Sequence, residues 1–343
     1  MAPRGRRVIG TLASAVDRAV TAAVRLGQNR ARAEDELSDE ARIELLEATR
    51  AFYAGRSDIF GPVKSIAPLC TRAGDSWDVA WPSSHRVLDE RLCGELERYP
   101  INGTCHARVR SRDSGRPAAI FVHGYLAGDF EFGERVWPLA RFEALGFDTA
   151  LFTLPFHGLR VAPHLRRNPP FPGRDPALTV EGFRQAVGDL RELVHWFRGR
   201  GASAVGLVGM SLGGYTAALT ATVERDLAFL VPVIPLACLA DFAREQGSLP
   251  RSASVALRYE AALRDAYRVV SPLERASLIE PGRTLVIGAQ ADRITHVSHA
   301  RRIAHHFSAP LHTWPGGHLV QWGRSEAFDR VESFLRGLGL TRD

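Results

Sequence analysis

The sequence predicts an α/β protein built on a doubly wound, mostly parallel β-sheet. From about residue 75 onward, short apolar runs alternate with longer segments of helical periodicity, the order expected when helices cover both faces of such a sheet. With 343 residues, 45% of them hydrophobic, the chain can bury the core of one large domain with appendages, or of two domains. We divide it into an N-terminal helical extension, residues 1–75, and a sheet domain, residues 76–343.

The extension is predicted to begin with an amphipathic, basic helix. Its apolar stripe consists of residues spaced four apart, Val8, Leu12, Val16, Val20 and Val24. The stripe is mostly valine and contains no Trp or Phe, which favours packing on the protein or on a partner chain over peripheral contact with an anionic membrane. Asp17 and Arg18 interrupt it, which argues against a signal peptide. A second helix is expected over residues 35–53.

The sheet domain is predicted to begin with an antiparallel strand in "TCHARVRSR" and a buried strand in "PAAIFV". Further strands are expected in "DTALFTLP", "AVGLVGM", "LAFLVPVI", "RTLVIGA" and "PLHTWP". Helices are expected over residues 134–145, 177–199, 213–224, 295–307 and 325–338. A mostly helical insertion over residues 238–279 is expected to form a small cap, because insertions at strand ends vary most in this kind of scaffold.

Charge and composition exclude several classes of function. The net charge of +6 is contained in residues 1–33, where seven arginines face Asp17 alone, so the sheet domain is balanced and no nucleic-acid binding is expected of it. Four cysteines without a C-x-x-C pair indicate reduced thiols in a cytoplasmic protein. No apolar stretch is long enough to span a bilayer. With neither a phosphate-binding glycine loop nor clustered metal ligands, no cofactor or metal is expected.

The segment "GLVGMSLGGY" holds the strongest candidate for chemistry, Ser211. The pattern Gly-x-Ser-x-Gly is weak by itself, because a glycine-rich chain produces it by chance. Here the serine falls where a buried strand ends and a helix begins, as a nucleophile on a sharp strand–turn–helix connection requires. The glycines two residues before and after it leave room for so tight a turn.

A serine hydroxyl needs a base and a carboxylate that orients the base. His318 ends "TWPGGH", after the last predicted strand, and is the candidate base. Asp292 in "VIGAQADRIT" is the candidate orienting acid, and Asp241 in "LACLADFA" is the alternative; a helix cap is the ordinary role of either aspartate. His305 and His306 lie in a helical pattern and are expected to be exposed.

Backbone N–H groups must also stabilise the oxyanion of an acyl-transfer reaction. The candidates are the N–H of Leu212, where the helix after Ser211 begins, and that of Tyr125 in "FVHGYLAG", the loop after the first parallel strand. His123 and Gly124 shape this loop, which could equally be a simple strand-ending turn.

Together, "FVHGY", "GMSLGG", "IGAQADRIT" and "GGH" resemble the α/β-hydrolase superfamily over roughly residues 80–340. The chain looks most like α/β-hydrolase-domain proteins of unassigned substrate and is somewhat similar to dienelactone-hydrolase-like and acetyl-esterase-like enzymes. The resemblance implies Ser211 as nucleophile, His318 as base and then acid, and Asp292 as its orienter. It departs at Phe156, where many relatives have an aspartate that steadies the loop. The neighbouring His157 is expected either to line the entrance or to cap a turn.

We therefore expect a serine hydrolase that cleaves a small-molecule carboxylic ester through an acyl-enzyme. The same residues also fit an acyltransferase, an amidase or a thioesterase. A further alternative is a weakly catalytic binding protein that docks on a membrane or a partner through its basic N-terminal helix. In the cap, apolar residues are expected to line an acyl pocket, Phe242, Leu249, Leu257 and Tyr259.

Overall fold

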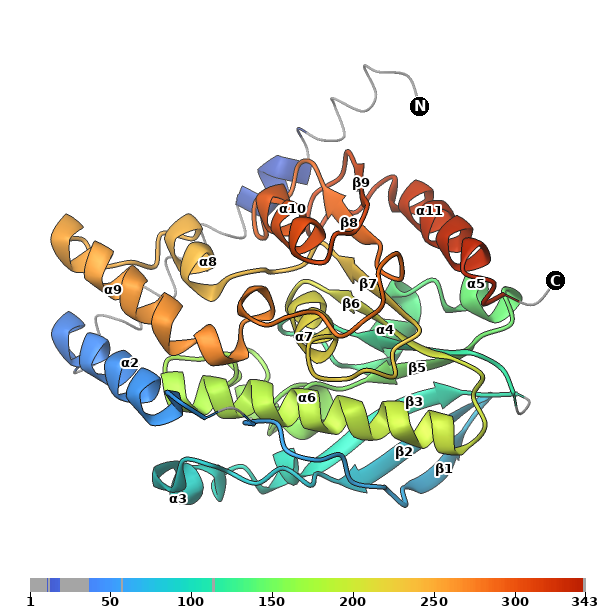
Figure 1. Ribbon diagram of the computed structural model, residues 1–343, viewed down its shortest axis with the longest axis horizontal. Helices are drawn as coiled ribbons and strands as arrows, with labels where there is room; N and C mark the ends of the chain where they lie inside the picture. Colours follow the sequence, from blue (N-terminus) through green and yellow to red (C-terminus); the bar gives the residue numbers. More distant parts are fainter. Residues whose placement is uncertain (1–10, 12, 19–36, 57, 113–114, 342–343) are drawn as a thin grey trace.

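The computed structural model describes residues 11, 13–18, 37–56, 58–112 and 115–341. Their centre is a nine-stranded sheet of order β1-β2-β3-β5-β4-β6-β7-β8-β9 (Figure 1). The strands are β1 (Leu69–Ala73), β2 (Ser76–Pro82), β3 (Thr104–Arg110), β4 (Ala118–Val122), β5 (Asp148–Phe152), β6 (Val205–Met210), β7 (Phe229–Val233), β8 (Val286–Ala289) and β9 (Leu311–Trp314). Strands β4 to β9 run parallel, whereas β1, β2 and β3 are antiparallel to their neighbours. The doubly wound, mostly parallel sheet is confirmed.

Strand β4 lies where the winding of the sheet reverses. It pairs with β5 on one side and β6 on the other, so Val122 at its end lies opposite both Phe152 and Gly209. The loops that leave β4 and β6 therefore diverge from neighbouring points at one edge. In open α/β sheets such a switch point, at the carboxyl ends of the strands, is where a crevice for ligands forms.

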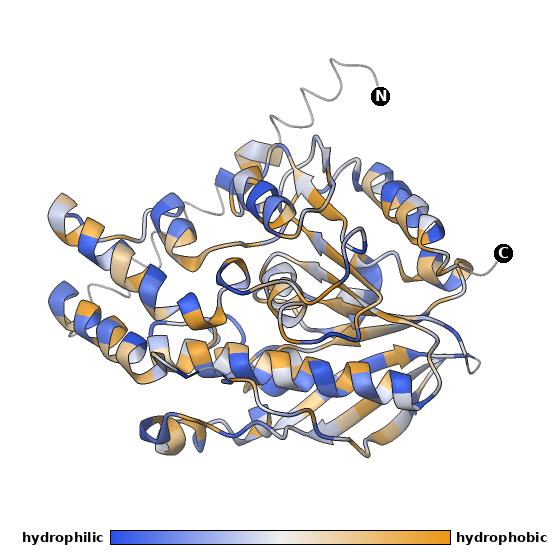
Figure 2. Ribbon diagram, viewed as in Figure 1, coloured by the Kyte–Doolittle hydropathy of each residue, from blue (hydrophilic) through white to orange (hydrophobic). Residues whose placement is uncertain are grey.

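Helices cover both faces of the sheet. Alternate residues of β4 point to opposite faces: Ile120 belongs to the core under α6 (Pro176–Gly199), α7 (Leu212–Thr220) and α10 (Val297–His306), and Phe121 belongs to the core under α4 (Phe130–Val136), α5 (Leu139–Ala144) and α11 (Arg324–Gly337). Figure 2 shows the apolar central strands in orange and mixed colours along α6. The helices are α2 (Asp39–Tyr53), α3 (Cys93–Leu96), α4 (Phe130–Val136), α5 (Leu139–Ala144), α6 (Pro176–Gly199), α7 (Leu212–Thr220), α8 (Leu239–Glu245), α9 (Ala253–Ala266), α10 (Val297–His306) and α11 (Arg324–Gly337).

Two predicted elements differ from the structure. The helix expected over residues 134–145 is divided into α4 and α5, because Pro138 cannot continue a helix and disfavours helical backbone at Trp137. The expected helical extension over residues 1–75 also contains a strand, β1, which pairs with β2 across the chosen boundary. Strand β1 is an exposed edge strand, "LCTRA", and carries no apolar alternation that would have indicated it.

The extension packs against the sheet domain. Ile43, Leu46 and Tyr53 of α2 belong to the same apolar core as the sheet, and α2 lies against α9. The Tyr53 hydroxyl donates to the Glu181 carboxylate on α6. Helices α8 and α9, in orange, lie at the end of the molecule where α6 begins (Figure 1). The insertion expected to form a cap is thus mostly helical, as predicted.

The described part of the N-terminal helix differs from the predicted stripe. Residues 11 and 13–18 are helical, and Ala13, Ser14 and Asp17 are buried, whereas Val16 is 42% exposed. The buried face is therefore not the valine face at this point. The other stripe residues, Val8, Leu12, Val20 and Val24, lie outside the described residues. Among the helices of the described ranges, none has the length and apolar character needed to cross a membrane.

Candidate active site

Ser211 lies on a sharp turn between β6 and α7. Its φ is 56°, in the left-handed region that is unfavourable for residues with a side chain. A Cβ on Gly209 would lie 2.2 Å from the Gly213 carbonyl oxygen, and one on Gly213 would lie 2.1 Å from the Val122 carbonyl oxygen. Only glycine fits at either position, which explains the spacing in the sequence.

The Ser211 backbone is fixed, whereas its hydroxyl is not used by the fold. The Ser211 N–H donates to the Val233 carbonyl at 3.0 Å, and its carbonyl accepts from the N–H groups of Tyr215 and Leu236. Although Ser211 occupies the N-cap position of α7, its side chain makes no capping hydrogen bond. Among the described residues no group hydrogen-bonds to its Oγ. An ordinary helix cap therefore does not explain this serine.

The loop after β4 approaches Ser211 closely. A Cβ on Gly124 would lie 3.4 Å from Ser211 Cβ and 4.0 Å from its Oγ. Leu126 in the same loop has a φ of 64°. The Tyr125 N–H has no acceptor within the described ranges, and the N–H of Leu212, the first residue of α7, has none within its own helix. Both N–H groups therefore remain candidates for binding a ligand oxygen.

His123 holds this loop in shape. Its Nδ1 lies 2.7 Å from the Gly124 carbonyl oxygen and its Nε2 lies 3.0 Å from the Leu154 N–H. Nδ1 must therefore donate and Nε2 accept, which requires a neutral ring with its proton on Nδ1. Burial lowers the pKa of His123 to about 3, so the ring stays neutral.

The loop after β5 is steadied without the aspartate of many relatives. The buried Phe156 has a φ of 59°, and its N–H donates to Asn102 Oδ1 at 2.9 Å. The neighbouring His157 is 1% exposed, and its Nδ1 lies 2.8 Å from the Pro155 carbonyl oxygen. It closes a turn and does not line an open entrance. Burial lowers its pKa to about 4.

His318 and Asp292 meet in a hydrogen bond. The Nδ1 of His318 lies 2.8 Å from Asp292 Oδ2, and Asp292 Oδ1 accepts the N–H groups of Ile294 and Thr295 at 2.8 Å each. The Thr295 hydroxyl oxygen lies 3.1 Å from Asp292 Oδ2 and 3.0 Å from His318 Nδ1. Burial lowers the pKa of His318, but the Asp292 carboxylate outweighs it, with a further contribution from Asp17, and the pKa is raised overall.

Asp241, the alternative acid, belongs to a different cluster. It lies at the start of the cap and forms ion pairs with Arg264 at 2.8 Å, with Arg244 at 3.1 Å and with Arg302. Burial favours its neutral form, yet the arginines lower its pKa to about 2. Of the two candidate acids, the structure places Asp292 beside His318.

The His318 loop lies beside the end of β6. The Gln321 amide donates to the His318 carbonyl at 2.8 Å and lies 3.5 Å from the sulfur of Met210, the residue before Ser211. Within the described residues no hydrogen bond joins Ser211 Oγ to His318. Sequence reasoning missed Gln321 and Thr295, because a single polar residue in a loop carries no pattern.

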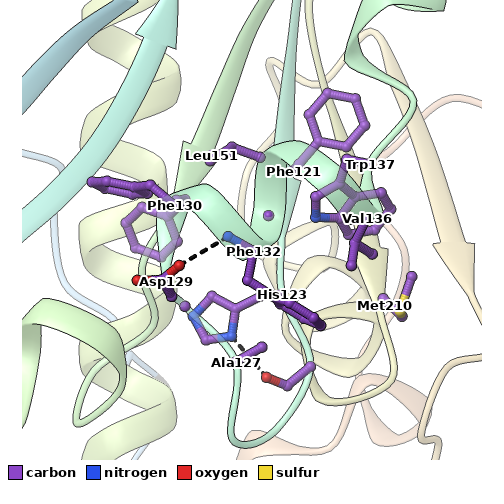
Figure 3. A pocket seen from close by; sticks show the side chains of 14 residues that line it. Phe121, His123, Ala127, Asp129, Phe130, Phe132, Val136, Trp137, Leu151 and Met210 are labelled. Carbon is purple, nitrogen blue, oxygen red and sulfur yellow. Dashed lines mark hydrogen bonds between the residues drawn. The ribbon is translucent and has the colours of Figure 1, made fainter. Parts of the chain in front are cut away.

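A small apolar cavity of about 50 Å³ adjoins the candidate site (Figure 3). Its lining includes Gly124 and Met210, the neighbours of Ser211. The rest is mainly apolar, with Phe121, Phe130, Phe132, Val136, Trp137 and Leu151 among its side chains. The residues expected to line an acyl pocket from the cap do not line this cavity: Leu257 is 72% exposed, and Phe242, Leu249 and Tyr259 pack on the core.

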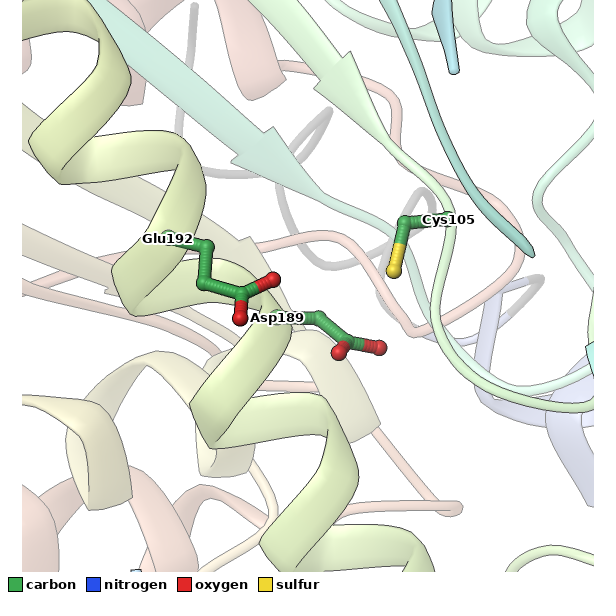
Figure 4. A group of neighbouring side chains, drawn as sticks. All are labelled: Cys105, Asp189 and Glu192. Atoms are coloured by element: carbon green, nitrogen blue, oxygen red, sulfur yellow. The ribbon is translucent and has the colours of Figure 1, made fainter. Parts of the chain in front are cut away.

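Two further groups of side chains have the composition of metal ligands. Glu192 and Asp189 on α6 point toward Cys105 on β3 (Figure 4). The Arg160 guanidinium lies 2.8 Å from Asp189, and burial raises the pKa of the Cys105 thiol well above its usual value. A buried cation is thus already present, and the thiol is protonated, so this group fits a structural ion pair better than a metal site.

The second group is half-exposed and also paired. His195 lies 3.0 Å from Glu224, which also binds the Arg191 guanidinium at 3.2 Å. The third member, Asp226, is exposed. In both groups arginines already lie against the carboxylates, so we propose neither as a metal site. All four cysteines are free.

Comparisons with known proteins agree with this architecture. The profile of the family "Alpha/beta hydrolase domain containing 18" matches residues 110–251. Uncharacterized proteins from two strains of Mycobacterium tuberculosis are 34% identical over 256 residues, which cover 71% of this chain and 59% of each relative. The match thus spans less than two thirds of the length of these relatives.

Solved esterase structures share the fold. Acetyl xylan esterase from Paenibacillus sp. R4 aligns with a TM-score of 0.52 at 16% identity, over 85% of this chain and 93% of that one. Acetyl xylan esterase 1 from Thermoanaerobacterium sp. aligns with 0.53 at 15%, over 87% and 94%. The esterase Pf2001 of Pyrococcus furiosus aligns with 0.53 at 14%, over 81% and 99%. At these identities the likeness concerns the fold, which is that of the α/β-hydrolases.

Proposed function

We propose, from the premise that this chain is a member of the α/β-hydrolase superfamily, that it is a serine hydrolase acting on carboxylic esters. The observation that supports the proposal most strongly is the pair His318–Asp292, whose Nδ1 and Oδ2 atoms lie 2.8 Å apart. The loops that carry this pair lie at the same edge of the sheet as Ser211, whose hydroxyl is free and whose backbone is strained. A nucleophile, a base and an oriented carboxylate in this chain order are the components of acyl transfer.

In the proposed reaction, Ser211 Oγ attacks the carbonyl carbon of the ester while His318 Nε2 takes the hydroxyl proton. Because Asp292 accepts the Nδ1–H, Nε2 is the atom left free to act as the base. The N–H groups of Leu212 and Tyr125 stabilise the oxyanion of the tetrahedral intermediate. The alcohol then leaves with the proton from His318, and an acyl-Ser211 ester remains.

The second half of the reaction uses the same groups. Water attacks the acyl carbon and gives its proton to His318 Nε2, and the proton then returns to Ser211 Oγ as the acid is released. The protonated His318 is stabilised between these steps by the Asp292 carboxylate, which has no cation of its own among the described side chains.

A short apolar acyl group is the substrate part that fits best. The cavity beside Gly124 and Met210 is lined mainly by carbon and has a volume of about 50 Å³, which is small for a ligand site. A buried apolar wall favours an acyl chain over a charged group. Two of the structural neighbours are acetyl xylan esterases, enzymes whose names specify an acetyl ester, which supports a short acyl group in this chain.

The test compares Ser211→Ala with Ser333→Ala. Ser333 is an exposed serine of α11 whose hydroxyl bonds only to its own helix. We expect the unsubstituted protein and Ser333→Ala to hydrolyse p-nitrophenyl acetate and to be labelled by a fluorophosphonate probe at Ser211. Ser211→Ala should lose labelling and most of its turnover, by up to about 10⁶-fold as in other triads. Hydrolysis and labelling that survive in Ser211→Ala contradict the proposal.

A further inference from the structure

Asp17, in the N-terminal helical segment, is fully buried against the loops that carry His318 and Asp292. Its Oδ2 accepts the N–H of Arg293 at 3.1 Å and that of His318 at 2.8 Å, and its Oδ1 accepts the N–H of Leu319 at 3.1 Å. One carboxylate thus binds the backbone of both loops. In Figure 1 the short blue helix of residues 13–18 lies beside α10 and the loops after β8 and β9.

The three donors lie just beyond the end of the β8–β9 ladder. Two backbone hydrogen bonds still join the segments that follow β8 and β9 after the strands end. They run from Gln290 N to Trp314 O, 2.9 Å, and from Ala291 N to Gly316 O, 3.0 Å. The next donors come from Arg293, His318 and Leu319, and their acceptor is Asp17. Convergent backbone N–H groups form an anion-binding nest, and buried N–H groups require an acceptor.

The segment fits closely against the glycine pair that precedes His318. A Cβ on Gly317 would lie 2.7 Å from Asp17 Oδ2 and 3.1 Å from Ala13 Cβ, so a side chain there would displace the helix. Ser14 Oγ accepts a bond from Arg293 Nε at 2.7 Å. The contact therefore consists of a close backbone approach, a hydrogen bond from the Arg293 guanidinium and a buried carboxylate, all made by residues 13–17 of the helix.

Asp17 also supplies negative charge near the base. Among the residues that the structure describes, the charged groups that face His318 are Asp292, from the loop before α10, and Asp17, from the N-terminal helix. The Arg293 side chain binds Ser14. Burial lowers the pKa of His318, and the two carboxylates raise it, Asp292 more than Asp17. The N-terminal segment thus acts on the base through backbone geometry and through charge.

We propose that Asp17 is a positioning residue, whose carboxylate fixes the loops of His318 and Asp292 relative to each other and so makes the N-terminal segment part of the active site. The inference rests on the proposed function, in which these two residues act on Ser211. It assigns no contact between Asp17 and the substrate.

The experiment uses full-length Asp17→Asn and Asp17→Ala, with Ser14→Ala as the matched control. Asparagine keeps the size but loses the charge, and its NH₂ group must face at least one backbone N–H. Ser14→Ala removes the bond between the same helix and the Arg293 side chain, and it leaves the three backbone N–H donors with their acceptor. We expect kcat for p-nitrophenyl acetate to fall about 10- to 100-fold in both Asp17 variants, the loss typical of a small displacement of catalytic groups, with KM nearly unchanged. Ser14→Ala should stay within about twofold.

A second measurement reports on His318 without requiring turnover. NMR titration of ¹³C-labelled histidines, with the His318 signal assigned by its loss in His318→Gln, gives the pKa of this residue. Asp17→Asn should lower that pKa and move the acid limb of kcat/KM to lower pH in parallel. Gly317→Ala, which keeps the carboxylate but displaces it, should change both readouts in the same direction.

The outcomes separate this inference from the proposed function. Variants that only unfold at lower temperature, with the His318 pKa and the pH limb unmoved, would show that Asp17 merely stabilises the fold and would overturn the inference. Absence of fluorophosphonate labelling in the unsubstituted protein refutes the proposed function. In that case the His318 pKa still tests whether Asp17 acts on this ring: an unchanged pKa in Asp17→Asn overturns that part of the inference, and a lowered pKa supports it.

Discussion

The imidazole of His318 and the carboxylate of Asp292 are joined by a hydrogen bond of 2.8 Å, and both oxygens of the carboxylate have further partners in its own loop. The second oxygen of Asp292 is held by two N–H groups, those of Ile294 and Thr295. A carboxylate so fixed determines which ring nitrogen carries the proton. Activity should therefore be sensitive to a substitution that preserves the shape of Asp292 and alters only its ability to accept the His318 hydrogen bond.

Asp292→Asn is that change. The amide places either a donor against His318 Nδ1, which reverses the tautomer, or a neutral acceptor, which keeps it. In both orientations the protonated ring loses the stabilising charge. We expect kcat to fall by about 10⁴-fold, as when the orienting acid of other triads is replaced by its amide. The measurement is kcat for p-nitrophenyl acetate.

Asp241→Asn is the matched control for that loss. Asp241 is also buried, but its partners are arginines of the cap and of α10. We expect activity within a few-fold of the unsubstituted protein and a lower melting temperature, because the arginines lose their common acceptor. Equal losses of kcat in the two variants would mean that Asp292 has no special role.

The pH dependence of activity should follow His318. The pKa of this ring is raised above its ordinary value of 6.5, by Asp292 against the effect of burial, and only the neutral ring accepts the serine proton. We expect kcat/KM to rise with pH through a single limb above pH 6.5. Asp292→Asn should move that limb to lower pH. A limb below pH 6 in the unsubstituted protein contradicts His318 as the base.

The same shift has the opposite effect on stability. Because the folded protein holds the protonated ring more tightly than the unfolded chain does, His318 contributes stability that is fully present below pH 6.5 and is lost as the pH rises through its folded pKa. Deprotonation of His318 therefore produces the neutral ring that can act as the base and at the same time removes its contribution to stability.

Much of the site could be predicted because its residues occupy places fixed by the order of the chain. Ser211 follows a buried strand and precedes a helix, and Asp292 and His318 follow the next-to-last and the last strand. Parallel strands bring such loops to one edge of the sheet whatever the sequence between them. The apolar runs of β4 and β6 identified these strands, because both faces of each are buried.

What could not be predicted depends on contacts between distant segments. Asp17 was interpretable only as a charge interrupting an apolar stripe, and its three N–H partners come from loops nearly 300 residues away. The stripe itself suggested a buried valine face, but at Val16 the face is exposed, since small residues permit the close approach at Gly317. Strand β1 was missed because it is short and exposed, and β2, which also precedes the first predicted strand, was missed with it.

Gly213→Ala tests the tight turn around Ser211. A Cβ there would lie 2.1 Å from the Val122 carbonyl oxygen and 2.5 Å from that of His123, so backbone must move where the oxyanion is to be bound. We expect a loss of about 1–3 kcal/mol in the free energy of unfolding and a loss of activity larger than this destabilisation accounts for. Chemical unfolding and kcat/KM measure the two effects.

Gly188→Ala is the control for that substitution. Gly188 lies within α6, and nothing lies within 4 Å of an added Cβ. Alanine should stabilise the protein by about 0.5–1 kcal/mol, because glycine loses more backbone entropy in a helix, and should leave activity unchanged. If Gly188→Ala and Gly213→Ala have the same free energy of unfolding and the same kcat/KM, the close approach at Gly213 is not needed for activity.

Acid should weaken the fold through the loops beside Ser211. Burial lowers the pKa of His123 to about 3 and that of His157 to about 4, whereas both ionise near 6.5 in the unfolded chain. Their neutral forms contribute stability that is present above pH 6.5 and is lost as the pH falls toward 4. We expect the melting temperature to drop between pH 7 and pH 4.5, and to drop less in His157→Phe. An equal drop in both proteins rules out His157 as a source.

The choice of acyl chain should be set by the cavity beside Met210 and not by the cap. Val136 and Phe132 of α4 line this cavity, whereas Leu257 of α9 is 72% exposed. Val136→Trp fills the space. We therefore expect kcat/KM for p-nitrophenyl butanoate to fall about 10- to 100-fold relative to kcat/KM for the acetate. Each buried CH₂ contributes about 0.8 kcal/mol, and the added ring also blocks the acyl chain sterically. Leu257→Ala should leave the ratio unchanged.

Because fluorophosphonate labelling of Ser211 reports the nucleophile separately, a selective change in the ratio with labelling intact would place the acyl group in this cavity. A shift in the ratio caused by Leu257→Ala alone would place it under the cap instead.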